Sequence, residues 1–155
     1  MRKTKAIKGA ANAFRVALNL NDKSRDIEDK ILESPFYSYL YSSLVKKSPW
    51  PEAEKKILTN LACYMYARDV IKSRWEPAEN FLSKDPMFSF FYAKDVIKGR
   101  FEQGEDCIST SSFWLCKYAE LLGTLPENLR SAALLMSFEK NEDWIKEYIK
   151  NESND

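Results

Sequence analysis

The sequence predicts an all-α protein built from short repeated helix pairs, and three observations indicate this fold. Residues 66–75 (YARDVIKSRW) return as residues 92–101 (YAKDVIKGRF), so Tyr66 and Tyr92 are 26 positions apart. Self-similarity at a period of 20–50 residues is typical of repeat architectures. The apolar residues of each copy recur at the spacing of one helix face. Only four glycines occur in 155 residues, which favours helices over a loop-rich β fold.

The repeat rests on a skeleton that extends beyond these two copies. A glutamate, an apolar residue three positions later, a polar break and a tyrosine recur four times, and the second copy is one residue shorter. The glutamates are Glu28, Glu54, Glu79 and Glu105, and the tyrosines are Tyr41, Tyr66, Tyr92 and Tyr118. The predicted repeats are therefore residues 28–50, 51–75, 76–101 and 102–126.

Each repeat, of about 25–26 residues, has room for two short helices. The first helix is predicted over residues 51–59 and 76–82, where an initial proline or acidic residue suits the unpaired amides of a first turn. Pro86 then marks a break, because the residue before a proline avoids helical geometry. The second helix is predicted over residues 87–100 and is expected to stop near Gly99. Its predicted buried face consists of Phe88, Phe91, Tyr92, Val96 and Ile97.

The two ends depart from the skeleton, as terminal units do because they cover the end of a repeat core. Residues 1–27 are predicted to form an N-terminal capping helix and linker, and residues 127–155 C-terminal capping helices and a tail. The N-terminal helix is expected over residues 5–20, packed on the first repeat through Ile7, Ala11, Phe14 and Leu18. Further helices are expected over residues 126–138 and 144–149. The whole chain is predicted to be one domain, a compact solenoid-like array.

Charge and composition argue against several classes of function. A formal net charge of +1 predicts neither a nucleic-acid footprint nor an acidic partner. Three cysteines without metal-ligand spacing favour reduced thiols in a cytoplasmic protein. No stretch approaches the roughly 18 apolar residues of a membrane span, and the basic N-terminus lacks the apolar region of a secretory signal. The sequence therefore predicts a cytoplasmic protein without a membrane interaction.

No catalytic, cofactor-binding or metal-binding residues are predicted. The chain contains no histidine, which removes the usual general base and the commonest zinc ligand and excludes Ser–His and Cys–His nucleophiles. The sequence also lacks the GxxxxGK[ST] and GxGxxG loops that bind phosphates. We therefore interpret the sequence as that of a non-enzymatic protein without cofactor or metal.

The recurring glutamates allow two interpretations. A paired-acid site needs two carboxylates at a defined separation. The favoured interpretation is structural, because Arg74 precedes Glu79 and Arg100 precedes Glu105 by the same five residues across a predicted turn. An arginine fork that matches each carboxylate would hold one repeat to the next.

The four tyrosines also allow two interpretations. They could form a stacking ladder for nucleic-acid bases, as in single-strand binders. Valine and isoleucine follow Tyr66 and Tyr92 on the same predicted helices at positions +4 and +5. This pattern favours buried rings with hydroxyls at the rim of the core.

Basic residues recur on the second helices and are the candidate partner-binding residues of this chain. They are Arg68, Lys72, Lys94, Lys98 and Arg100. Rows of such residues could contact phosphate. Alternatively, they are solvated or pair with Asp69 and Asp95, which lie three residues before Lys72 and Lys98.

The motif YA-[RK]-D-V-I-K-x-R-[WF]-E-x-x-E resembles short repeats in uncharacterised proteins of tailed bacteriophages and giant viruses. The resemblance covers residues 28–126 and is strongest in the two middle repeats. The first repeat departs from the motif at residues 42–45, and the fourth lacks the final Arg-[Trp/Phe]. The resemblance implies a viral origin and an α-helical repeat fold, and it implies no catalytic residues. The layout is also similar to tetratricopeptide-like arrays, with a shorter repeat.

The expected function is that of a phage-encoded accessory factor that binds a host or viral protein. Stacked helix pairs commonly present extended surfaces for protein recognition. The alternative is a nucleic-acid-binding accessory protein that uses the basic residues of the repeat helices.

Overall fold

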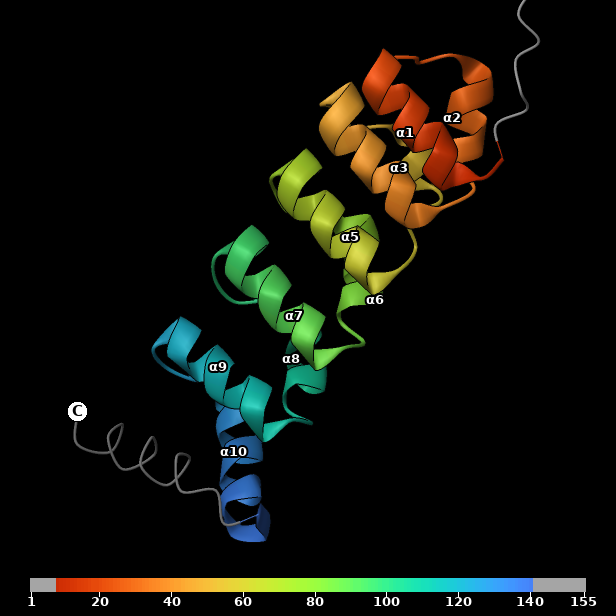
Figure 1. Cartoon of the computed structure of the whole chain (residues 1–155). Helices are drawn as coiled ribbons and strands as arrows, with labels where there is room; N and C mark the ends of the chain where they lie inside the picture. The colour runs from red at the N-terminus through yellow and green to blue at the C-terminus, as the bar shows by residue number, and fades with distance from the viewer. Residues whose placement is uncertain (1–7, 141–155) are drawn as a thin grey trace, which may run out of the picture. The chain divides into compact units, whose positions relative to one another are not determined.

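The structure of the chain is a computed structural model that describes residues 8–140 (Figure 1). Within this range it contains ten α-helices and three π-helical segments, which confirms the predicted all-α fold class. The chain divides into two compact bodies, an N-terminal body (Met1–Phe81) and a C-terminal body (Leu82–Asp155). The boundary falls inside the third predicted repeat. The expectation of a single solenoid-like domain stays a prediction.

The N-terminal body begins with helix α1 (Ala10–Leu20), which packs against α2 (Arg25–Ile31) and α3 (Pro35–Tyr41), as Figure 1 shows. This confirms that the N-terminal helix covers the first repeat. Its buried residues are Ala13 and Ala17.

The buried face of α1 differs from the predicted one. Leu18 is 48% exposed, Ala11 is exposed, and Phe14 is half-buried with its ring centroid 5.8 Å from that of Tyr37. The alanines form the contact because their small side chains let the helix axes approach closely. Ile7, the remaining residue of the predicted face, lies outside the described residues.

The next six helices fall two to each predicted repeat, and α10 (Glu127–Lys140) follows the last repeat. The six are α4 (Pro51–Glu54), α5 (Asn60–Tyr66), α6 (Glu76–Leu82), α7 (Pro86–Tyr92), α8 (Glu102–Ile108) and α9 (Ser112–Leu122). In the N-terminal body α3 lies beside α5, and in the C-terminal body α7 lies beside α9 (Figure 1). The helix predicted over residues 51–59 is shorter than expected, and the one expected over residues 144–149 lies outside the described residues.

The predicted break before the second helix is present in the third repeat, and the structure shows that this helix begins with a side-chain cap. The Asp85 carboxylate accepts hydrogen bonds from the backbone amides of Met87 and Phe88, at 2.9 and 3.1 Å. Pro86 then occupies the first turn, where a missing amide proton leaves no hydrogen bond unmade.

The second helices of three repeats do not end as α-helices. They continue into π-helical segments, η1 (Ser42–Lys46), η2 (Ala67–Ile71) and η3 (Ala93–Ile97). The amide of the next lysine then donates to the carbonyl five residues back, as from Lys72 to Ala67 at 2.8 Å. Nothing in the sequence indicates these wider turns.

A left-handed lysine terminates each π-helical segment. Lys47, Lys72 and Lys98 have φ angles of 56°, 59° and 59°. The prediction that Gly99 would stop the third segment is therefore wrong by one residue, because Lys98 already turns the backbone.

The predicted buried face of the helix in the third repeat is also partly wrong. Val96 and Ile97 are half-exposed, as are Phe88 and Phe91. The buried residues are Ser89, Phe90, Tyr92 and Ala93. Nearly every residue of α7 is apolar, so periodicity alone could not select a face. Ser89 can be buried because it is small and because its hydroxyl donates to the Leu82 carbonyl at 2.9 Å.

The four repeat tyrosines are fully buried, which confirms the core interpretation. Their hydroxyls do not end at a rim. The Tyr66 hydroxyl donates to Glu54 at 2.9 Å and accepts from the Trp50 amide at 2.8 Å. Tyr66 thereby ties the first helix of its own repeat to the last aromatic residue of the repeat before it, and Tyr118 does the same with Glu105 and the Phe101 amide.

Candidate functional site

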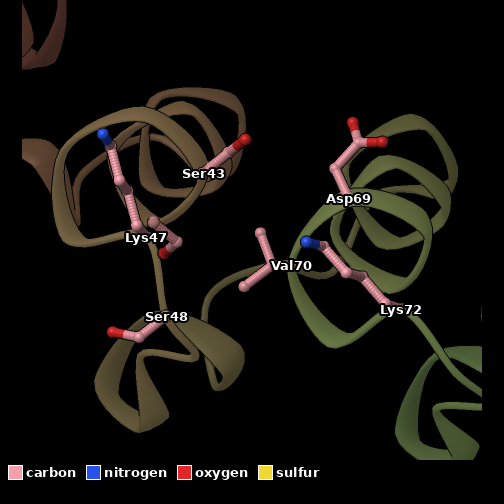
Figure 2. A pocket seen from close by; sticks show the side chains of 7 residues that line it. Ser43, Lys47, Ser48, Asp69, Val70 and Lys72 are labelled. Carbon is pink, nitrogen blue, oxygen red and sulfur yellow. The ribbon is translucent and has the colours of Figure 1, made fainter.

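A polar pocket of the N-terminal body lies between the π-helical segments η1 and η2, as Figure 2 shows. It has a volume of about 230 Å³. Its lining consists of Ser42, Ser43, Lys47, Ser48, Asp69, Val70 and Lys72. The pocket therefore lies where the second helices of the first two repeats end.

Local backbone geometry places the lysines of this pocket. In a left-handed conformation the Cβ atom crowds the following carbonyl, at a cost of roughly 1–2 kcal/mol for a residue other than glycine. Lys47 and Lys72 both adopt it and both are exposed. Figure 2 shows the Lys72 ammonium directed into the gap beside Val70, whereas the Lys47 ammonium points away from this gap, over η1.

One wall of the pocket is a hydrogen-bonded chain that joins the two repeats. The Tyr39 hydroxyl donates to Asp69 at 2.7 Å. The Arg68 guanidinium donates to both oxygens of Asp69, at 2.7 and 2.9 Å, and to the Tyr64 hydroxyl at 3.2 Å. Three hydrogen bonds therefore hold the Asp69 carboxylate in the wall, and the charge of Arg68 offsets its negative charge.

The pKa values of this wall follow from the same contacts. The hydrogen bonds from Arg68 and Tyr39 outweigh partial burial and hold the pKa of Asp69 below its ordinary value. Burial and the Asp69 carboxylate raise the pKa of Tyr39 to about 12. At neutral pH Asp69 is thus charged, Tyr39 is neutral, and the charge of Arg68 offsets that of Asp69.

The five predicted partner-binding residues fall on both bodies. Arg68 and Lys72 belong to the N-terminal body, and only Lys72 lines the pocket. Arg68 is bound to Asp69, so the expected pair of Asp69 with Lys72 gives way to a pair with the adjacent arginine.

Lys94, Lys98 and Arg100 belong to the C-terminal body. Lys94 lies 6.0 Å from the ring centroid of Phe90. Lys98 is exposed in the left-handed conformation. Arg100 is engaged by Glu105, at 2.6 and 2.9 Å. The lysines of the candidate set are therefore more accessible to a partner than its arginines.

The candidate set left out Lys47, although it stands among the recurring basic residues of the second helices, and it contained none of the serines that line the pocket. A signal was present, because Lys47, Lys72 and Lys98 each follow a repeat tyrosine by six residues. The first repeat departs from the motif at residues 42–45, and this departure concealed the equivalence of Lys47.

The recurring glutamates are structural, as predicted. Arg74 binds the buried Glu79 at 2.6 and 2.8 Å, which matches the Arg100–Glu105 pair. Glu28 accepts from the Tyr41 hydroxyl at 2.9 Å and from Lys46 at 2.8 Å.

The described residues offer little for nucleophilic or metal chemistry. Among them, no three histidine, cysteine, aspartate or glutamate side chains gather as a metal site would require. Burial raises the pKa of the Cys63 thiol to about 12, so this cysteine stays protonated at neutral pH.

A second surface feature lies on the C-terminal body. Phe90, Phe91, Phe113 and Trp114 form a cluster of rings whose centroids are 4.8–5.7 Å apart in four contacting pairs. Phe113 is 58% exposed. Aromatic residues are enriched in protein interfaces, so the cluster is a further surface suited to protein contacts.

Comparison with protein-family models, curated proteins and solved structures gives no match for this chain. Between residues 8 and 140, none of the helices has the length and apolar character that crossing a membrane requires.

Proposed function

We propose that this chain is a non-enzymatic α-helical repeat protein, a phage-encoded accessory factor that binds a host or viral protein in the host cytoplasm. The observation that carries the proposal is the exposed lysine held in a left-handed conformation at the end of three repeats. Glycine would relieve the strain at these positions, yet a long charged side chain occupies each of them. Strained residues of this kind are concentrated at functional sites.

The surroundings of these lysines favour recognition over catalysis. The pocket beside Lys72 contains hydroxyls and a neutralised carboxylate, and the exposed rings of the C-terminal body suit protein contacts. The viral origin rests on the resemblance of the repeat motif to those of phage and giant-virus proteins.

Nucleic-acid binding is the second candidate, favoured by Lys72, Lys94 and Lys98, which are all exposed. It is the weaker candidate because Arg68 and Arg100, the residues best suited to bind phosphate in a fork, already bind carboxylates.

A capture experiment separates the two candidates. The tagged chain is incubated with bacterial host lysate, with and without nuclease, at low and high salt. A single protein retained through both treatments is the expected result, because phosphate contacts release counterions and weaken steeply with salt. Loss of all captured material under nuclease and high salt would favour nucleic acid.

Two matched variants connect any captured protein to the left-handed lysines. In the first, Lys47, Lys72 and Lys98 are replaced by glutamine. In the control, Lys23, Lys55 and Lys84, which are exposed but not left-handed, are replaced likewise. The proposal expects capture to be lost in the first variant and retained in the control, although both lose the same charge.

A further inference from the structure

We propose that the pocket between η1 and η2 binds the carboxylate of a glutamate or aspartate side chain of a polypeptide partner. This inference rests on the proposed function, because it names the chemical group by which a protein partner would be held.

The charges around the pocket favour an anion. Lys47 and Lys72 line it, and the only carboxylate among its lining residues is Asp69. Asp69 is already bound by Arg68 and Tyr39, so its charge is offset within the wall. The pocket therefore has an excess of two positive charges, both on exposed side chains.

The hydroxyls add directional hydrogen bonds. Ser42 is occupied, since its hydroxyl donates to the Ser38 carbonyl at 2.8 Å. Ser48 is exposed and lines the pocket. A carboxylate that receives hydrogen bonds from Ser48 and the Lys72 ammonium would have two charged or polar donors, and Lys47 can rotate to add a third.

The size of the pocket restricts the ligand. Pockets for drug-sized molecules span roughly 300–1,000 Å³, and a water molecule takes up about 30 Å³. A volume of about 230 Å³ accommodates one acidic side chain with a few waters. Val70, which Figure 2 shows beside Lys72, would supply an apolar contact for the methylene groups of that side chain.

A carboxylate suits this pocket better than a phosphate group. The guanidinium of Arg68 already binds Asp69 and is not available for a phosphate fork, so a phosphate group would lack the partner that suits it best. The N-terminal body also exposes Phe36, Leu44 and Leu61, each at 41–49%. Of these, Leu44 directly follows the lining residue Ser43, and an exposed apolar residue beside a charged pocket fits a folded or peptide partner.

The test is a titration followed by ¹H–¹⁵N NMR of the full chain. The probes are N-acetyl-glutamate amide, N-acetyl-glutamine amide, inorganic phosphate and a short single-stranded oligonucleotide. The expected result is a saturable shift of the Ser48, Val70 and Lys72 amides with the glutamate probe and at least ten-fold weaker binding of the glutamine probe.

Two variants complete the design. Lys72→Gln is expected to weaken binding of the glutamate probe at least ten-fold, whereas Lys55→Gln, the same substitution at an exposed lysine of the same body that does not line the pocket, is expected to leave it unchanged. Thermal melting of each variant verifies that the fold is retained. Retention is expected because the substituted lysines are exposed.

Three results would overturn the inference. They are saturable shifts with phosphate or the oligonucleotide but not with glutamate, equal binding of glutamine, and the absence of saturable shifts. The proposed function has a separate readout. A partner captured from lysate that Lys72→Gln still retains would leave the protein-binding function standing while the carboxylate pocket fails.

Discussion

The hydroxyl of Tyr118 lies 3.2 Å from Oε1 of Glu105 and 2.7 Å from the backbone nitrogen of Phe101. It donates to the carboxylate and accepts from the amide, so one buried side chain satisfies two buried polar groups. The same arrangement recurs at Tyr66, with Glu54 and Trp50.

Removal of this hydroxyl is expected to be costly. Tyr118→Phe leaves the buried Phe101 amide without its partner and removes one hydrogen bond from Glu105, which keeps those from Arg100 and Asn128. An unsatisfied buried group costs about 1–3 kcal/mol. Urea unfolding followed by circular dichroism measures the loss. Tyr37→Phe, at a half-buried ring that contacts Phe36, is the control and is expected to change stability by less than about 0.5 kcal/mol. Equal stability of the two variants would contradict the role given to the hydroxyl.

Glu105 also predicts a dependence of stability on pH. Burial raises its pKa, but hydrogen bonds from Arg100, Asn128 and Tyr118 outweigh burial and hold the pKa below its ordinary value of 4.5. A group whose pKa is lower in the folded state stabilises the fold above its unfolded pKa. That contribution is lost as pH falls from about 4.5 through the folded value.

The measurement is the urea midpoint of the wild type and Glu105→Gln between pH 7 and pH 3. The variant is expected to be less stable at pH 7 by about 1–3 kcal/mol, because hydrogen bonds to a buried charge are lost. The difference between the two proteins is expected to shrink below pH 4.5. A difference that stays constant over this range would show that the charge of Glu105 does not stabilise the fold.

The left-handed lysines predict a gain of stability on substitution by glycine. Lys72→Gly removes the crowding of Cβ at φ 59° and is expected to stabilise the chain by about 1 kcal/mol. Lys94→Gly, within η3 and without a positive φ, is expected to destabilise it by about 1 kcal/mol. Thermal melting measures both. A destabilising Lys72→Gly would mean that the lysine side chain contributes to the fold as well as to recognition.

Two glycines of the C-terminal body make a second matched pair. A Cβ atom on Gly104 would lie 2.6 Å from Cδ1 of Phe101 and 2.7 Å from Oγ of Ser89. Gly104→Ala is therefore expected to destabilise the chain by about 1–3 kcal/mol through overpacking. Gly99→Ala meets nothing within 4 Å and is expected to be neutral or slightly stabilising. Comparable melting temperatures for the two variants would contradict this packing.

The sequence was sufficient for the helix pairs because the signals were local or repeated. Asp85-Pro86 marked a capped restart, and Arg100 and Glu105 stood at a spacing that recurs in Arg74 and Glu79. The π-helical segments were not predictable in this way. A wide turn differs from an α-turn by one residue, and Ala93–Ile97 contains nothing that a plain helix excludes.

The candidate site was only partly predictable for a related reason. Lys72 was among the candidate residues because it recurs with Lys98 in the motif. Lys47 was left out of the candidate set because its neighbours Ser43 and Leu44 do not match the motif. The pocket also depends on the pairing of Arg68 with Asp69, and a sequence of alternating charges does not reveal which partner an aspartate selects.

The left-handed lysine has a consequence for finding related chains. In three repeats it follows the buried tyrosine by six residues and precedes the closing aromatic residue by three, even where the intervening letters differ. A search profile that scores this spacing, with weight on the tyrosine, the lysine and the aromatic residue, would detect diverged copies. A profile built on the letters YA-x-D-V-I would overlook the first repeat of this very chain.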